Sequence, residues 1–303
     1  MEFLTDPIAW WIEPFTNNVF MQRALWAALL AVLTTSVVGT WVVLRGMTFL
    51  GDAFAHGVLP GIALAYIIGF STTLGALAAA LLIVGGINLI RNFSPLSEDT
   101  SIGVLFVGFL ALAVVIMSSG AGAYSGDLTR FLFGSITGID GGDLRRQAIA
   151  AAISVGATVV LHRALFVTTF DEAQARLAGM RPRLAHAALL TLLAIAIVSS
   201  FEAVGSLLVF AFLVAPAATA SLLVRRVPRI MMTAVGLGAV AAIIGLLVSY
   251  HHGTAAGATM ALATVVMLLV TLLVTGVIRA LRSSASDSAA DSEQTELAPQ
   301  NSH

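Results

Sequence analysis

Two ionisable side chains in an otherwise apolar stretch are the strongest candidates for chemistry in this sequence. Asp52 and His56 lie four residues apart within RGMTFLGDAFAHGVLPGIAL, residues 45–64. In a helix this spacing puts both on one face, and inside a membrane span such residues are costly unless they are paired or hydrated. A carboxylate and an imidazole suit a divalent transition metal, and a site with only two ligands lets the ion leave again. The alternative is an Asp–His pair that merely orders a helix end.

Three further residues are weaker candidates for metal binding. Glu202 lies near the outer end of an apolar run, where a carboxylate at the level of the lipid headgroups is the simpler interpretation. His251 and His252 fall in the turn SYHHGTAAG, residues 249–257. They could form a second metal contact at the mouth of a pathway, although solvated histidines are commoner at such a turn.

The helix that carries Asp52 also has a stripe of small residues. Gly57 and Gly61 make a GxxxG step, a spacing that allows helices to approach closely in membranes. Pro60 lies between them and is expected to kink the helix, because it cannot donate the backbone hydrogen bond. We therefore assign Gly57, Pro60 and Gly61 to helix packing.

The composition of the chain excludes several classes of protein. Of its 303 residues, 58% are hydrophobic and 10% are charged, against about 45–50% and about 25% in soluble domains. All 15 positive charges are arginine, so the chain has no lysine. This excludes a P-loop ATPase, whose phosphate-binding motif needs a lysine, and it excludes Schiff-base chemistry. The absence of cysteine excludes disulfides and thiolate metal sites, and a net charge of −1 leaves no broad cationic surface for nucleic acid.

The fold class predicted from these features is an all-α, polytopic membrane protein with eight or nine transmembrane helices. An apolar run of about 20 residues crosses a bilayer of about 30 Å as a helix. We predict spans at 22–44, 52–69, 72–90, 101–118, 147–163, 184–201, 203–224, 230–250 and 254–278. The chain then divides into an N-terminal interfacial segment at 1–21, a transmembrane domain at 22–282 and a disordered cytoplasmic tail at 283–303.

The distribution of arginines predicts the orientation of the chain. When the loops are assigned to alternating sides, eleven arginines fall on one face and four on the other. The four are Arg23, Arg130, Arg145 and Arg146. By the positive-inside rule the face with eleven is cytoplasmic. We expect a multi-pass protein of the cell membrane whose C-terminus is cytoplasmic.

A short helix is predicted on the cytoplasmic face, at about residues 170–178. Thr169 and Glu172 have the spacing of a capping box. Gly179 suits a left-handed C-terminal cap, and Pro182 prevents the helix from continuing. A helix of this length is too short to span a membrane.

The same short helix needs a surface on which to dock. Phe170, Ala173 and Leu177 recur at three- and four-residue spacing, so a helix would place them on one face. A two-turn helix is unstable alone in water. The surface that stabilises it is either the headgroup layer or a partner protein.

Four stretches of this sequence resemble a known family. RGMTFLGDAFAHGVLPG at 45–61 closely resembles the signature of the permeases of ATP-binding-cassette importers for manganese, zinc and ferrous iron. VGSLLVFAFLVAPAATA at 204–220, LFGSITGIDGGDL at 132–144 and FDEAQARLAG at 170–179 are also similar to this family. The outer turn HHGTAAG at 251–257 departs from the family pattern, and the acidic tail is additional.

The resemblance implies roles for particular residues. Asp52 and His56 match the acidic residue and the histidine associated with metal passage. The loop at 132–144 falls on the outer face, where an extracytoplasmic metal-binding protein would sit. Residues 170–179 match the coupling helix that docks on the ATPase, and the residues assigned to this role are Phe170, Asp171, Glu172, Ala173, Leu177 and Gly179.

The expected function is therefore that of a permease subunit for Mn, Zn or Fe(II), three metals that share these ligand types. We expect no permanently bound cofactor: the metal is the cargo, and ATP binds to a partner. The expected partners are cytoplasmic ATPase subunits, an extracytoplasmic metal-binding protein, membrane lipids and a second permease copy, identical or closely related. Nucleic acid is not among them.

Three rival functions are distinguishable by particular features. A permease for cobalamin or ferric siderophores needs a wide, weakly polar passage, whereas Asp52 and His56 favour a bare cation. A secondary transporter coupled to ions or protons has no ATPase that residues 170–178 could engage. A membrane scaffold that transports nothing would have no use for Asp52 inside a span.

Overall fold

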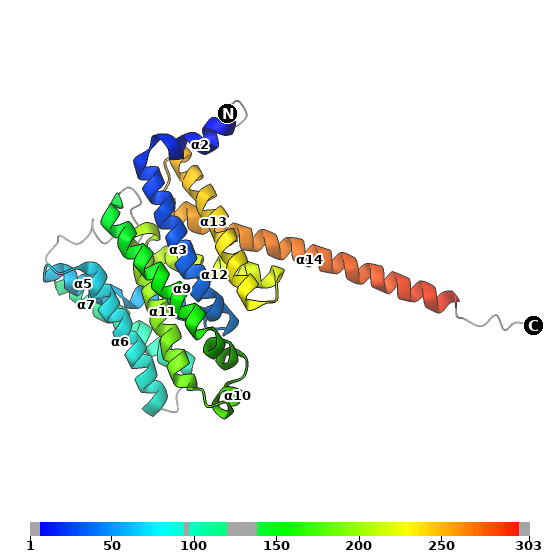
Figure 1. Cartoon of the computed structure of the whole chain (residues 1–303), viewed down its shortest axis with the longest axis horizontal. Coiled ribbons are helices and arrows are strands. Elements are labelled where there is room, and N and C mark those ends of the chain that lie inside the picture. The colour runs from blue at the N-terminus through cyan, green and yellow to red at the C-terminus, as the bar shows by residue number, and fades with distance from the viewer. Residues whose placement is uncertain (1–6, 94–96, 120–137, 297–303) are drawn as a thin grey trace, which may run out of the picture.

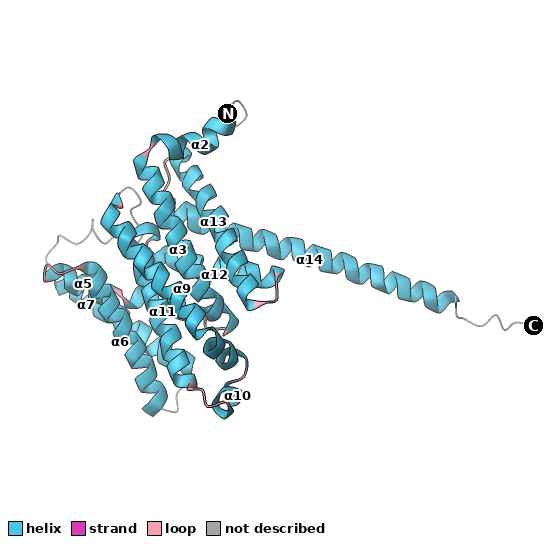
Figure 2. Cartoon of the chain, in the orientation of Figure 1, coloured by secondary structure: helices cyan, strands magenta, loops and turns pink. Residues whose placement is uncertain are grey.

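The structure, a computed structural model, describes residues 7–93, 97–119 and 138–296. Every secondary-structure element in these ranges is a helix (Figure 1, Figure 2), which confirms the all-α prediction. The helices in chain order are α2 (Pro7–Asn17), α3 (Val19–Leu44), α4 (Thr48–Gly57), α5 (Leu59–Ile67), α6 (Thr72–Phe93), α7 (Glu98–Ser119), α9 (Gly141–Phe170), α10 (Glu172–Leu177), α11 (Pro182–Val204), α12 (Ser206–Leu223), α13 (Val227–His252) and α14 (Ala256–Glu296).

Eight stretches of the described chain are long and apolar enough to cross a membrane. They are α3, α4 together with α5, α6, α7, α9, α11, α13 and α14. A shorter apolar helix covers Leu208–Leu223 within α12, and Gly205, with a φ of 91°, separates α12 from α11. The prediction of eight or nine spans is confirmed, and α12 is the helix that makes the difference between the two numbers.

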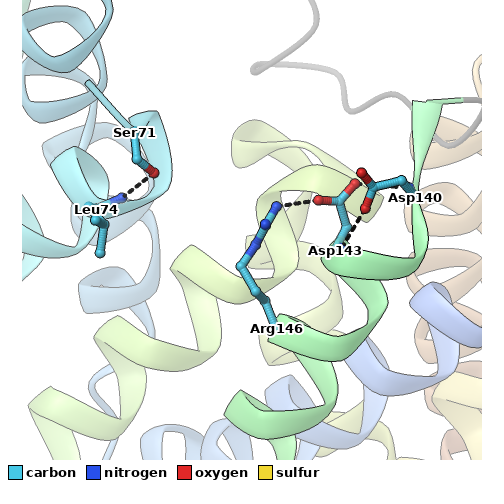
Figure 3. A network of polar contacts seen from close by, with 5 residues as sticks. All are labelled: Ser71, Leu74, Asp140, Asp143 and Arg146. Carbon is cyan, nitrogen blue, oxygen red and sulfur yellow. Dashed lines mark hydrogen bonds and ion pairs between the residues drawn. The ribbon is translucent and has the colours of Figure 1, made fainter. Parts of the chain in front are cut away.

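The fifth span is longer at both ends than the predicted 147–163. Helix α9 has 30 residues and begins at a capping box, in which Asp140 accepts a hydrogen bond from the Asp143 amide at 2.8 Å. The Asp143 carboxylate in turn accepts from the Asp140 amide at 3.0 Å and also pairs with Arg146 (Figure 3). Because these polar residues satisfy the free amides of the first turn, the helix extends beyond the apolar run that sequence hydropathy detects.

The core of the protein is built around α3. This helix packs against α9, α11, α12 and α13, and its alanines Ala24, Ala27, Ala28 and Ala31 are fully buried. Small side chains let the surrounding helices come close. Helices α5, α6 and α7 lie together on one side of this centre, and α13 and α14 pair on the other (Figure 1).

The span that carries Asp52 is broken where the sequence predicts a kink. Helix α4 ends at Gly57 and α5 begins at Leu59, with Pro60 in the first turn of α5. Pro60 cannot donate to the carbonyl of His56 four residues earlier, so the helical hydrogen bonding is interrupted there. The break falls directly after the candidate metal ligand.

The stripe of small residues brings α5 against α6. A Cβ atom added to Gly61 would collide with the carbonyl oxygen of Gly75, and one added to Gly75 would collide with that of Gly61. A Cβ on Gly57 would collide with the side chain of Ile83. The two backbones of α5 and α6 therefore meet directly, in the way that a GxxxG step allows.

We predict that Gly61→Ala destabilises the protein by about 1–3 kcal/mol, the usual cost of overpacking, because a backbone carbonyl cannot move aside as a flexible side chain can. The measurement is the thermal unfolding temperature of the detergent-solubilised protein. Gly85→Ala in α6 is the control, since a Cβ at Gly85 meets no atom within 4 Å. Equal melting temperatures for the two variants would contradict this packing role.

The two ends of the helix bundle carry different elements. Helix α2 covers one end, where it contacts α3 and α13, and α10 lies at the other (Figure 1). Helix α14 continues to Glu296 and projects from the bundle (Figure 1), so residues 283–296 form part of a helix where the sequence predicts a disordered tail.

Candidate functional site

Helix α4 follows a tight corner at the end of α3. The Gly46 amide donates to the carbonyl of Val43 at 3.0 Å and the Met47 amide to that of Val42 at 3.1 Å. Gly46 has a φ of 70°, a left-handed conformation in which glycine carries no steric cost. Because the Met47 carbonyl accepts from Leu50 at 3.1 Å, α4 starts at once and its orientation is set by α3.

The structure brings Asp52 and His56 together on one face of α4. His56 Nε2 lies 3.6 Å from Asp52 Oδ1, and the side chains are 25% and 37% exposed, respectively. The opposite face is apolar and carries Leu50 and Phe54, both fully buried. The ring of His56 makes an edge contact with Phe106 of α7 at a centroid distance of 5.8 Å. A partly open carboxylate–imidazole pair is therefore presented beside apolar walls.

One chain supplies only part of a metal coordination sphere. Nowhere in the described ranges do three or more His, Cys, Asp or Glu side chains gather in a way that could hold a metal ion. Protein sites for transition metals usually have at least three side-chain ligands, so an ion at Asp52 and His56 would need water or a second chain to complete its shell. This arrangement suits a metal that passes as cargo.

His251 and His252 make other contacts and do not join this pair. His251 lies at the end of α13 with its Nε2 atom 3.2 Å from the Trp10 carbonyl oxygen, and its ring stacks on Trp10 at 4.5 Å. His252 Nδ1 lies 3.1 Å from the carbonyl oxygen of Val248 in its own helix. Metal binding by these histidines stays a prediction. The backbone of Glu202 lies in α11, but its side chain is outside the described part of the structure.

The loop predicted to face a metal-binding protein is only partly visible. Residues 132–137 of the motif at 132–144 lie outside the described residues. The remainder forms the capped start of α9 shown in Figure 3. There the Asp143 amide pulls the pKa of the Asp140 carboxyl below its usual value, against the opposing effect of desolvation.

The short helix predicted at 170–178 is present as α10. It is capped by Asp171, whose carboxylate accepts from the Gln174 amide at 2.8 Å. Thr169 was the wrong choice of cap, because its hydroxyl donates to the Leu165 carbonyl at 2.5 Å within the last turn of α9. Phe170 is likewise the last residue of α9 and not part of α10.

Helix α10 ends at the predicted glycine. Gly179 has a φ of 72°, the Met180 amide donates to the Ala175 carbonyl at 3.0 Å, and the Gly179 amide donates to the Arg176 carbonyl at 3.1 Å. These two bonds form a Schellman motif. A helix that is only six residues long is thus held at both ends.

One side of α10 is open and apolar. Ala175 is buried against the bundle, whereas Ala173 and Phe170 are exposed and Leu177 is 89% exposed. Glu172, on the same helix, binds Arg176 at 2.7 Å and lies 3.8 Å from Arg91 of α6. The hydrogen bond from Arg176 is the main cause that lowers the pKa of the Glu172 carboxyl, and the charge of Arg91 adds to it.

Sequence reasoning missed the residues that join these parts. Arg45 donates from Nε to the hydroxyl of Thr169 at 3.0 Å and from Nη2 to that of Thr168 at 2.7 Å. Arg91 was counted only as a positive charge near the cytoplasmic face. A polar side chain directly at the end of an apolar run was the available signal for Arg45, but the sequence does not identify its partners.

The helical bundle, the half-open Asp–His pair in a broken span and the separate capped helix α10 define a polytopic membrane transport component. The chain belongs to the ABC 3 transport family, whose profile matches residues 17–275. It is accordingly the multi-pass membrane component of an ABC transporter and not its ATPase, which another chain provides.

Two curated relatives match most of the chain. One is the manganese transport system membrane protein MntC of Listeria innocua, 34% identical over 259 residues, covering 86% of this chain and 92% of that protein. Another, from Haemophilus influenzae, carries the name "Probable iron transport system membrane protein" and is 34% identical over 253 residues, covering 84% and 92%.

A solved structure shares the same fold. It is PsaBC from Streptococcus pneumoniae in complex with a Fab, with a TM-score of 0.79 and 32% sequence identity. The match covers 88% of this chain and 95% of that chain.

Proposed function

We propose that this chain is the permease of an importer that moves a bare divalent transition metal, Mn²⁺ or Fe²⁺ in the first place and Zn²⁺ as a third candidate. The observation that carries the proposal is the Asp52–His56 pair, 3.6 Å apart and half-open on α4. The names of the relatives from Listeria innocua and Haemophilus influenzae, which refer to manganese and iron, support the same cargo. Oxygen and imidazole ligands suit all three metals.

The incomplete coordination at Asp52 and His56 favours a pathway shared by two permease copies. Helix α4 packs against α7, α11 and α12 of its own chain, while its Asp–His face stays partly open. A second copy facing it would contribute an equivalent pair and complete a four-ligand site. An extracytoplasmic metal-binding protein would deliver the ion at the α2 end.

The exposed surface around α10 is the proposed docking site for the ATPase. It combines the open Leu177 side chain with a hollow of about 530 Å³ beside α10. The hollow is lined by Glu172, Arg176, Met180, Arg181, Pro182, Arg183 and Leu184. The exposed apolar side chain of Leu177 beside a hollow lined in part by three arginines is complementary to a protein groove that is apolar at its centre and acidic at its edges.

Reconstitution with the ATPase and the binding protein tests this function. We expect ATP-dependent uptake of ⁵⁴Mn²⁺ into proteoliposomes, with competition by Fe²⁺ and weaker competition by Zn²⁺. Cobalamin and ferric siderophore serve as the rival cargoes. Uptake of either of these without metal uptake would contradict the proposal, as would metal uptake that a proton gradient drives without ATP.

The proposed orientation places the α10 end and the C-terminus in the cytoplasm, because assigning the loops to alternating sides puts eleven of the arginines on that face. Single cysteines are easily introduced into this cysteine-free chain. In intact cells an impermeant maleimide should label a cysteine at position 252 but not one at 177 or 227. Labelling of position 177 from outside would overturn both the orientation and the docking site.

A further inference from the structure

The bonds of Arg45 connect two parts of the protein that are remote in sequence. Arg45 caps the end of α3, three residues before α4 begins, and its guanidinium binds Thr168 and Thr169, 123 and 124 residues away. These threonines lie in the last turn of α9, and Asp171, the cap of α10, comes two residues after Thr169. Arg45 therefore stands between the proposed docking helix and the helix that carries Asp52 and His56.

Both threonines hold their hydroxyl groups in a fixed direction. Thr168 Oγ1 donates to the Ala164 carbonyl at 2.7 Å, and Thr169 Oγ1 donates to the Leu165 carbonyl at 2.5 Å. A hydroxyl has one proton and two lone pairs, so each oxygen is left as an acceptor for the guanidinium. The planar fork of arginine meets two such acceptors with less loss of side-chain freedom per hydrogen bond than a lysine would incur.

The corner that follows Arg45 is held by backbone hydrogen bonds and has little freedom to move. The amides of Gly46 and Met47 are bonded back to α3, and the Leu50 amide is bonded to the Met47 carbonyl. A displacement of Arg45 is therefore passed to α4 and not absorbed by a loose loop. In the other direction, the capped turn from Thr169 to Asp171 passes a displacement of α10 to Arg45.

A second contact reaches the far half of the same span. Glu172 of α10 lies 3.8 Å from Arg91 at the end of α6, and α6 meets α5 backbone to backbone at Gly75 and Gly61. The ion pair is partly exposed and is weak by itself. Together with Arg45, this ion pair nevertheless connects α10 to both halves of the broken span: to α4 through Arg45 and to α5 through α6.

We infer that Arg45 is the positioning residue that transmits movement of α10 to the Asp52–His56 pair, with the Arg91–Glu172 pair as a secondary connection. Arg45 contacts neither the metal nor ATP in this role. The inference rests on the proposed function for its direction, from ATPase docking to the metal pathway.

Arg45→Gln in the reconstituted complex tests this role. Because α10 and its docking surface are untouched, we expect ATP hydrolysis to stay within about twofold of the native rate. Uptake of ⁵⁴Mn²⁺ should fall at least about tenfold, so that fewer ions are moved per ATP. Thr168→Val with Thr169→Val removes the acceptors while preserving β-branched shape and should act in the same direction. Arg45→Lys should give an intermediate loss.

Thr191→Val is the matched control, because the hydroxyl of Thr191 donates to the Ala187 carbonyl within its own helix at 2.9 Å. It should leave both rates unchanged. Native uptake and hydrolysis in Arg45→Gln would overturn the inference. So would a parallel loss of both activities, since that result indicates impaired docking or folding.

A readout that needs no metal separates this inference from the proposed cargo. A cysteine replacing Phe49, which is exposed on α4, reports movement of that helix by its rate of alkylation in the solubilised complex. ATP should change this rate in the native background and not with Arg45→Gln. If that holds and no metal is taken up, the linkage stands and the cargo assignment fails; an ATP response that persists in Arg45→Gln overturns the linkage.

Discussion

Asp52→Asn and His56→Ala are each expected to lower the rate of Mn²⁺ accumulation at least about 100-fold, with the protein still present in the membrane. A unit charge pair at 4 Å is worth about 4 kcal/mol at an effective dielectric of about 20, and about 1.4 kcal/mol is a factor of ten. The loss of one carboxylate from a two-ligand site thus removes most of the attraction for a cation. Uptake into cells or proteoliposomes is the measurement.

The same variants should fold normally. Asp52 and His56 are 37% and 25% exposed and lie 3.6 Å apart, so removing either leaves no fully buried charge behind. Asp99→Asn, an exposed carboxylate at the start of α7, controls for a general effect of charge. Normal transport by both pathway variants would refute the metal role. Loss of both from the membrane would instead assign the pair to the stability of the helix end.

Local sequence patterns predicted the parts of the site that depend on neighbours along the chain. The i, i+4 spacing of Asp52 and His56 placed them on one helix face, and the structure has them there. Gly179 was predicted as the end of α10 because a left-handed residue is needed after the last turn. Pro60 interrupts the span where its missing donor requires a break.

The sequence was less informative where two neighbouring residues could each cap the same helix, and where a contact joins residues far apart in the chain. Thr169 and Asp171 are both good helix caps, and only the three-dimensional fold, in which Thr169 binds Arg45, decides for Asp171. Hydropathy located the apolar part of α9 but not its polar ends. The helix continues at its start because Asp140 caps it, and at its end Thr168 is bonded to Arg45. The pairing of Arg45 with α9 spans more than a hundred residues and has no local signature.

The docking role of α10 depends on shape, and this separates it from simple membrane contact. Leu177 is almost fully exposed, and Ala173 is exposed on the same short helix. If α10 lay in the headgroup layer, a tryptophan at position 173 would leave function unchanged, because tryptophan is favoured at membrane–water interfaces. If a groove on the ATPase receives α10, a bulky side chain at the contact prevents it from seating.

Ala173→Trp should therefore reduce transport and transport-stimulated ATP hydrolysis together, at least about tenfold, the range expected for a residue at the centre of an interface. Metal binding to the solubilised permease should be unchanged, because Asp52 and His56 are not altered. This pattern is opposite to that of Arg45→Gln, in which hydrolysis persists.

Leu177→Met, which keeps the apolar surface and approximate volume, is the matched control. Cysteines at 173 and 177 in the cysteine-free chain should cross-link to the ATPase, and if neither does so while Ala173→Trp transports normally, α10 is not the coupling helix.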